Sequence, residues 1–425
     1  MEVDQSESGL AVAYVKRRAI ADWSSSFVTL TPIGPDSGGW SVAISGRRPA
    51  SFFLTLVVGC TFACSSPPLA VAKPSPSQNA IAANSFCTVA QPSIWKQAFS
   101  RGEIATGAGE SMIPFAISST SGSLFASDYS PAWYGVVVYD GATGVRTRVA
   151  VLPPDDQVLA GAFDGRWLVW TELHSQTTYF DWTLYAWDSK TNRVVRLADA
   201  ARQNGELITG PVAWPVVKDG VASWSQAISS SVSELHLYLL STSQDRVIAT
   251  GTVSDPVFVG SWLVWDHLDA IGKRSVLAFA DARTGQSTTG PSALLNVLNP
   301  TMLVGNGQSL AWASSGLQEL WVWRTAWKAP IRMIGSPNSE YAEYPNIAGD
   351  IVTFDGVSGA WAADLRSSSI TKLSPEAGSV VAGGVSVAYY VAAPSTVKSS
   401  HPGLRVFLTE VRLLPPLPHT GSSCP

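Results

Sequence analysis

The chain has 425 residues, of which 46% are hydrophobic and only 14% are charged, so it can bury one large core or two ordinary ones. Its formal net charge is −4 and its basic residues form no cluster, which excludes nucleic acid as an expected partner. The chain contains 17 Trp, 35 Gly and 27 Pro and no long helical pattern, a composition typical of short strands and tight turns.

An apolar run at residues 52–59 follows Arg47 and Arg48 and ends at Cys60. It is too short to cross a bilayer, which takes roughly 20 residues, but it suits the apolar region of a signal peptide. The run from Val57 to Cys60, VVGC, resembles the bacterial lipobox, whose cysteine is diacylated and becomes the mature N-terminus. The sequence therefore predicts a lipoprotein signal peptide at 42–59 and a lipid anchor on Cys60. A secreted protein without lipid, or neither kind of signal, remains an alternative.

The residues before this signal are explained if translation starts at Val42, because bacterial genes often begin at a valine codon. Residues 1–41 are then a mis-called or disordered extension. Residues 60–86 are rich in Ser, Pro and Ala and lack a packing pattern, which predicts a tether. The folded domain is expected at 87–425, on the outer face of the cell membrane or, without the lipid, secreted.

A turn followed by a strand recurs along the body of the chain and is clearest at residues 163–198. Units begin near residues 115, 155, 210, 255, 298, 343 and 378, and their aromatic position recurs about every 44 residues, the spacing of four-stranded propeller blades. That position holds Trp170, Trp224, Trp265, Trp312, Phe354 and Tyr389. We expect these rings to fill the space between neighbouring blades.

A second recurring element is a hairpin with the pattern Asp-x-x-Thr followed by Gly or Asn, which contains Asp140, Asp188 and Asp281. A weaker copy lies at residues 363–373. The Asp side chain can accept hydrogen bonds from its own turn, and Gly or Asn tolerates the left-handed conformation that such a hairpin needs. Because these Asp residues share one repeat position, we interpret them as turn formers and not as catalysts or calcium ligands.

With these strands and hairpins, residues 115–415 resemble the TolB-like and WD-repeat-like β-propellers of bacterial envelope proteins. The resemblance implies an all-β fold, a β-propeller of about seven four-stranded blades after an N-terminal signal and tether, with six or eight blades as alternatives. It favours protein partners, but no TolB-specific partner-binding segment can be mapped. Function does not follow from the fold, because propellers host many unrelated activities.

Both ends of the expected ring offer a way to close it. The last unit can borrow a strand from near residues 95–99. Cys87 precedes the first blade and Cys424 is the penultimate residue, so the two cysteines are predicted to form a disulfide in an oxidising exterior. The alternative is two unpaired cysteines at flexible ends. Cys64 has no evident partner.

No motif predicts catalysis. The sequence contains no Gly-x-Ser-x-Gly, no Walker motif and no Gly-rich dinucleotide loop, and no α/β peptidase domain follows the repeats. No CxxC is present and no ligand series recurs in the blades, so no metal and no cofactor are predicted. His174 and His267 follow equivalent strands and are interpreted as exposed or locally hydrogen-bonded, and Asp155 and Asp156 as solvated loop carboxylates.

These observations predict a monomeric, non-catalytic binding or scaffold protein of the cell envelope, whose loops meet a protein, peptide or glycan. The candidate ligand-facing residues are Trp133, Trp182, Trp214, Trp327, His174 and His267. The alternative is a secreted propeller enzyme, a hydrolase or lyase acting on a glycan or lactone. The enzyme requires acids and histidines to converge at one mouth of the funnel, for which the candidates are His174, His267, Asp266, Asp269 and Asp355.

Overall fold

The computed structural model describes residues 28–32, 40–44, 86–106, 110–118, 121–130, 133–175, 178–268, 274–314, 316–335, 342–356, 359–374, 380–392 and 404–418. The chain divides into two compact units, Val15–Ala83 and a larger one with Met1–Tyr14 and Asn84–Pro425. In the smaller unit, β1 (Val28–Pro32) pairs antiparallel with β2 (Trp40–Ile44). Cys60, Cys64 and Cys424 lie outside the described residues. No helix in the described part of the chain is long and apolar enough to span a membrane.

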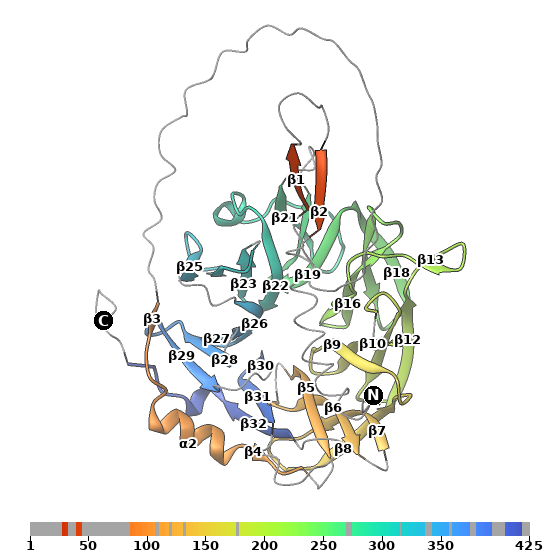
Figure 1. The fold of residues 1–425 in the computed structure, drawn as a ribbon. Coiled ribbons are helices and arrows are strands. Elements are labelled where there is room, and N and C mark those ends of the chain that lie inside the picture. Colours follow the sequence, from red (N-terminus) through yellow and green to blue (C-terminus); the bar gives the residue numbers. More distant parts are fainter. Residues whose placement is uncertain are drawn as a thin grey trace, which may run out of the picture. The chain divides into compact units, whose positions relative to one another are not determined.

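Seven sheets in the larger unit form the blades of a propeller (Figure 1). They are antiparallel except where β3 (Cys87–Thr88) adds a parallel edge strand to the sixth. Blade 1 contains β5 (Ser111–Ile117), β6 (Leu124–Ser130), β7 (Trp133–Tyr139) and β8 (Arg146–Val151). Blade 2 contains β9 (Gln157–Phe163), β10 (Trp167–Leu173), β11 (Trp182–Asp188) and β12 (Arg193–Asp199). Blade 3 contains β15 (Val216–Lys218), β16 (Val221–Ala227), β17 (Ser233–Leu239) and β18 (Gln244–Gly251). The small hairpin of β13 (Arg202–Gln203) and β14 (Glu206–Leu207) precedes it.

The second half of the ring follows the same plan. Blade 4 has three strands, β19 (Val253–Val259), β20 (Trp262–Leu268) and β21 (Ser275–Asp281), followed by a short 3-10 helix, η2 (Ser292–Leu294). Blade 5 contains β22 (Pro300–Asn306), β23 (Ser309–Ser314), β24 (Glu319–Arg324) and β25 (Ile331–Gly335). Blade 6 contains β26 (Glu343–Ala348), β27 (Ile351–Gly356), β28 (Gly359–Asp364) and β29 (Ser369–Ser374). Blade 7 contains β30 (Val380–Gly383), β31 (Ser386–Ala392) and β32 (Leu404–Glu410).

The first strands of successive blades contact one another in order, from β5 through β9, β15, β19, β22, β26 and β30 back to β5. They therefore form the inner wall of a closed ring (Figure 1). Each sheet begins within a few residues of a predicted unit. The prediction of an all-β propeller with about seven blades is confirmed. Blade 4 departs from the four-stranded pattern, since only isolated bridges such as that between Ala280 and Ser287 meet its outer strand.

Ring closure uses a different strand from the one predicted. Residues 95–99 belong to helix α2 (Ser93–Arg101), and the strand that completes blade 7 is β4 (Glu103–Ile104), which pairs with β32. Trp95 and Phe99 are both buried against blades 6 and 7. Their spacing of four fits one face of a helix or of a strand, so it could not distinguish the two. Pro92 precedes the segment and Gly102 follows it, and these residue types are typical of the start and end of a helix. They are the sequence signal that favours a helix over a strand here.

The aromatic position of each repeat is buried in six blades, with exposures of 0–8%. In five blades the ring stacks on the residue that faces it on the next strand. Trp170 also packs against Phe115 and Phe125 of the preceding blade. The rings thus fill the space between blades, as the repeat predicts.

The recurring Asp residues form turns, as predicted. Asp140 accepts hydrogen bonds from the backbone N–H groups of Ala142 and Thr143, and Asp281 accepts the equivalent pair from Arg283 and Thr284. The left-handed residues that follow are Gly144, Asn192 and Gly285, with φ of 71°, 52° and 69°. These backbone hydrogen bonds hold the pKa of both Asp140 and Asp281 below the usual range.

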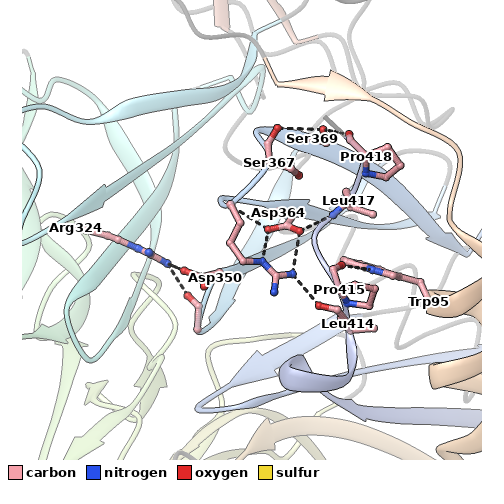
Figure 2. Close-up of polar contacts among 12 residues, drawn as sticks. Trp95, Arg324, Asp350, Asp364, Ser367, Ser369, Leu414, Pro415, Leu417 and Pro418 are labelled. Atoms are coloured by element: carbon pink, nitrogen blue, oxygen red, sulfur yellow. Dashed lines mark hydrogen bonds and ion pairs between the residues drawn. The ribbon is translucent and has the colours of Figure 1, made fainter. Parts of the chain in front are cut away.

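A polar network joins the C-terminal tail to blade 6 (Figure 2). The Asp364 side chain is fully buried and accepts hydrogen bonds from the Arg366 guanidinium and from the Leu417 backbone N–H at 2.9 Å. The tail includes η3 (Val411–Leu413), and Trp95 donates its indole N–H to the Pro415 carbonyl at 2.8 Å. Helix α2 and residues 414–418 are therefore fastened to each other and to blade 6 at one seam of the ring.

Candidate functional site

One face of the ring carries the start of each first strand and the end of each second strand, and we call it the loop face. His174, His267 and Asp355 all lie at this face, but on blades 2, 4 and 6. His267 contacts the Leu268 carbonyl through Nδ1 at 2.5 Å, and Asp355 accepts a hydrogen bond from the Val380 N–H at 3.1 Å. Asp269 lies outside the described residues. The enzymatic alternative requires these groups to converge, but within the described residues His267 and Asp355 do not join His174 in a cluster of ionisable side chains.

The predicted ligand-facing tryptophans differ in their surroundings. Trp133 and Trp182 begin strands at the loop face, whereas Trp327 follows β24 at the opposite face. Trp182 is only 4% exposed and belongs to the core. Trp133 is partly buried beneath the Arg148 guanidinium, 4.8 Å from its ring centre. Trp214 is also partly buried and lies 6.0 Å from the Tyr344 ring, which belongs to blade 6.

A cluster that the sequence did not predict lies at the loop face of blade 2. It consists of Asp156, Glu172 and His174, whose side-chain oxygen and nitrogen atoms lie within 4.8 Å of one another. Asp156 is 8% exposed and Glu172 is 5% exposed. His174 Nδ1 lies 2.7 Å from an Asp156 carboxylate oxygen. We call this group the blade 2 cluster.

The interpretation of Asp156 as a solvated loop residue is therefore wrong. The Asp156 N–H donates to the Pro153 carbonyl in a turn just before β9, and the side chain is buried, whereas Asp155 beside it is exposed. The sequence did contain one signal, because Glu172 and His174 are two residues apart at the end of a strand and so share a face. Asp156 comes from the preceding strand connection, which spacing along the chain could not relate to them.

The charge balance in the blade 2 cluster is unusual. Burial, followed by the hydrogen bond and charge of Asp156, raises the pKa of Glu172 to about 8. The Tyr134 hydroxyl of blade 1 donates to the Asp156 backbone carbonyl and shares a second hydrogen bond with the Tyr129 hydroxyl, and burial raises the pKa of Tyr134 above the usual range. Two carboxyl groups and an imidazole thus lie together. Within the described residues, neither carboxyl group forms an ion pair with a Lys or Arg side chain.

A second carboxyl pair lies on blade 4. Burial, together with the Asp266 carboxylate, raises the pKa of Asp255 to about 7. Asp255 has a left-handed φ of 47°, and one of its oxygens accepts the Met302 N–H at 2.8 Å. The Asp266 carboxylate accepts hydrogen bonds from the Ser254 and Ser275 hydroxyls at 2.6 and 3.0 Å. This pair is held by backbone and hydroxyl groups and is a structural feature of the inner wall.

Replacing Asp255 with Asn is expected to make the protein more stable than the parent above pH 7, with little difference below pH 4. The folded state keeps the Asp255 proton up to about pH 7, whereas the unfolded state loses it near the ordinary value of 3.8. The parent therefore loses stability as the pH rises from about 4 to about 7, and Asn cannot ionise. Asn also tolerates the left-handed conformation and can accept the Met302 N–H.

Urea unfolding between pH 4 and pH 9 measures this difference. The exposed Glu206, in the hairpin of β13 and β14, supplies the matched control Glu206→Gln. A stability gain for Asp255→Asn that does not change with pH would show that the Asp255 proton is not the cause.

Comparisons with known proteins assign no family to the chain. No family model and no curated protein matches the chain. Among solved structures, a chain from a study of two prolyl endopeptidases matches with 15% identity and a TM-score of 0.49, over 75% of this chain and 49% of that one. The present chain thus spans about half the length of that match.

Two further matches are of similar strength. TolB from Acinetobacter baumannii matches with 12% identity and a TM-score of 0.37, over 71% of this chain and 64% of TolB. An oligogalacturonate lyase from Vibrio parahaemolyticus matches with 10% identity and a TM-score of 0.47, over 72% of this chain and 92% of the lyase. All three TM-scores are below 0.5 and all three identities are 15% or lower, so no function is taken from these matches.

Proposed function

We propose that the protein is a non-catalytic binding or scaffold protein of the cell envelope, a lipid-anchored propeller that presents its loop face to a protein, peptide or glycan. The observation that carries this proposal is that His174, His267 and Asp355 belong to three different blades and that, among the described residues, His267 and Asp355 do not join His174 in a cluster of ionisable side chains. A rigid ring with loops of different length suits recognition.

Exposed apolar side chains on the loop face support the same proposal. Ile228 and Leu268, which lie at the ends of the second strands of neighbouring blades, are 40% and 39% exposed. Leu295 and Leu298, in the connection from blade 4 to blade 5, are 53% and 45% exposed. Apolar side chains at the rim of a binding surface contribute affinity once a partner covers them.

Charged substitutions on the loop face are expected to abolish partner capture. The double variant Ile228→Glu and Leu268→Glu should recover at least tenfold less partner from envelope membranes than the parent, because binding would bury two carboxylates without counter-ions. The matched control is Val145→Glu and Val385→Glu, at positions in the turns of the opposite face that are 56% and 48% exposed. Crosslinking and quantitative mass spectrometry measure the recovery.

Two results would contradict the proposal. The first is equal recovery with both double variants, and the second is no enrichment of any partner by the parent protein. The melting temperatures of both variants are measured first, so that a folding defect is not mistaken for lost binding. The intact mass of the captured protein tests the anchor, since the proposal requires a lipidated Cys60 as the mature N-terminus.

The second candidate function is a secreted propeller hydrolase or lyase acting on a glycan or lactone. One observation favours it, namely that the blade 2 cluster brings a His and two carboxyl groups together at the loop face. A buried carboxyl group with a pKa near neutrality is suited to general acid or base chemistry.

A further inference from the structure

We propose that Asp156, Glu172 and His174 form a binding site for a divalent transition-metal cation, with Zn²⁺ as the best-matched ion. Metal binding was not predicted from the repeats, because no ligand series recurs from blade to blade. The proposed site belongs to blade 2 alone and is assembled from the end of β10 and from the connection between β8 and β9. It is independent of the partner proposed for the loop face.

The donor set is the first argument. One imidazole nitrogen and two carboxylate oxygens lie within 4.8 Å of one another, and ligands of one Zn²⁺ at about 2.0–2.2 Å are at most roughly 4.4 Å apart. In the tetrahedral geometry of Zn²⁺ two ligand atoms lie roughly 3.3–3.6 Å apart. For all three donors to bind one ion, the widest separation must therefore shorten by about 1 Å, and the 2.7 Å between His174 Nδ1 and Asp156 must lengthen by a little under 1 Å. An imidazole together with carboxylates suits Zn²⁺, Fe²⁺ or Mn²⁺ better than the all-oxygen sites that Ca²⁺ and Mg²⁺ prefer.

The orientation of His174 is the second argument. The Thr183 hydroxyl donates to Asp199 at 2.8 Å, so its oxygen is left to accept a hydrogen bond from His174 Nε2–H, also at 2.8 Å. Arg196 forms an ion pair with Asp199, which keeps that carboxylate an acceptor. These contacts, from Arg196 through Asp199 and Thr183 to His174, fix the orientation of the imidazole ring. They direct Nδ1 of His174 toward Asp156. Metal-binding histidines are typically held in this way, with the second ring N–H donated to an oxygen.

The electrostatics of the cluster are the third argument. The Nδ1 lone pair and the Asp156 carboxylate are both acceptors, yet they lie 2.7 Å apart, so a proton or a metal ion must lie between them. Glu172 is 95% buried beside them and, within the described residues, forms no ion pair with a Lys or Arg. A cation at this point would bind both carboxyl groups as carboxylates, and its binding would release to solvent the protons that the cluster holds, the one on Glu172 included.

Access to the site is provided by His174. Its side chain is 31% exposed, whereas Asp156 and Glu172 are nearly closed to water. An ion can therefore enter from the loop face, where three protein ligands leave further coordination positions for water or for an anionic group of a ligand.

Calorimetric titration of the full chain tests the proposal. After treatment with a chelator and its removal, Zn²⁺ is expected to bind with a stoichiometry of one and to raise the melting temperature by several degrees. Glu172→Gln and His174→Ala should each weaken binding at least tenfold, because each removes a ligand. Ca²⁺ and Mg²⁺ at the same concentration should give no shift.

His267→Ala is the matched control, since His267 lies at the same face on blade 4 and is outside the cluster. It should bind Zn²⁺ like the parent protein. Equal affinity in the parent, Glu172→Gln and His174→Ala would overturn the proposal, as would the absence of saturable binding in the parent. Glu172→Gln keeps the size of the side chain, and its melting temperature without metal shows whether the blade is intact. Zinc K-edge absorption spectra provide a readout of ligand type that a purely structural role of His174 would not change.

Discussion

Replacing Cys424 with Ser is expected to lower the free energy of unfolding by about 2–5 kcal/mol, the range for loss of a native disulfide. Cys87 is disulfide-bonded. Its partner lies outside the described residues, so the pairing with Cys424 stays a prediction. A bridge between these two positions would close a loop that contains the entire ring, and loops of this length restrict the unfolded chain most.

The geometry of the seam favours Cys424 over the two cysteines of the tether. Cys87 lies opposite Ser369 where β3 (Cys87–Thr88) runs parallel to β29, and the Ser369 hydroxyl donates to the Pro418 carbonyl at 2.8 Å. Pro418 is therefore hydrogen-bonded to the residue that pairs with Cys87. Cys424 is six residues farther along the chain. Those residues can span up to about 20 Å.

Three variants distinguish the possible pairings. Cys87→Ser and Cys424→Ser should lose the same stability in denaturant unfolding, and a reducing agent should lower the parent protein to their level. Cys64→Ser should match the parent. If Cys64→Ser loses as much as Cys87→Ser while Cys424→Ser does not, then Cys87 pairs with Cys64 and the seam is held by noncovalent contacts alone. Peptide mapping without reduction identifies the bond directly.

The features that the sequence predicted well are those that repeat. The buried aromatic position and the Asp turn appear in several blades, so chance agreement between copies is small and each copy supports the others. The strand β4 has two residues and appears once, and its pairing with β32 joins residues about 300 positions apart. Neither periodicity nor local propensity predicts a pairing between residues so far apart in the chain. The sequence prediction therefore assigned the closing strand to residues 95–99, which form part of α2.

The blade 2 cluster could not be predicted for a related reason. Its members lie at corresponding edges of neighbouring strands, but Asp156 has no counterpart that the repeat pattern would bring to notice. Interpreting repeated residues as structural was correct for Asp140 and Asp281. Comparison of repeats gives no information about a residue that is present in one blade only. Such residues make one blade of a propeller chemically different from the others.

Trp170→Ala is expected to destabilise the protein by about 3–5 kcal/mol, the usual cost of truncating a fully buried aromatic side chain. The Trp170 ring is 0% exposed, stacks on Tyr185 at 5.4 Å and packs against Phe115 and Phe125 of blade 1. Its removal would leave a cavity at the boundary between two blades, which the rigid sheets on either side cannot fill.

Two substitutions separate packing from other effects. Trp170→Phe keeps an aromatic ring at this position and should cost less than about half of the alanine variant. Trp133→Ala, at a partly buried ring on the edge of blade 1, should cost about 1–2 kcal/mol. Chemical unfolding of the three variants measures these differences. If Trp170→Ala costs no more than Trp133→Ala, the aromatic position does not hold neighbouring blades together, and the repeat would have to be explained by strand propensity instead.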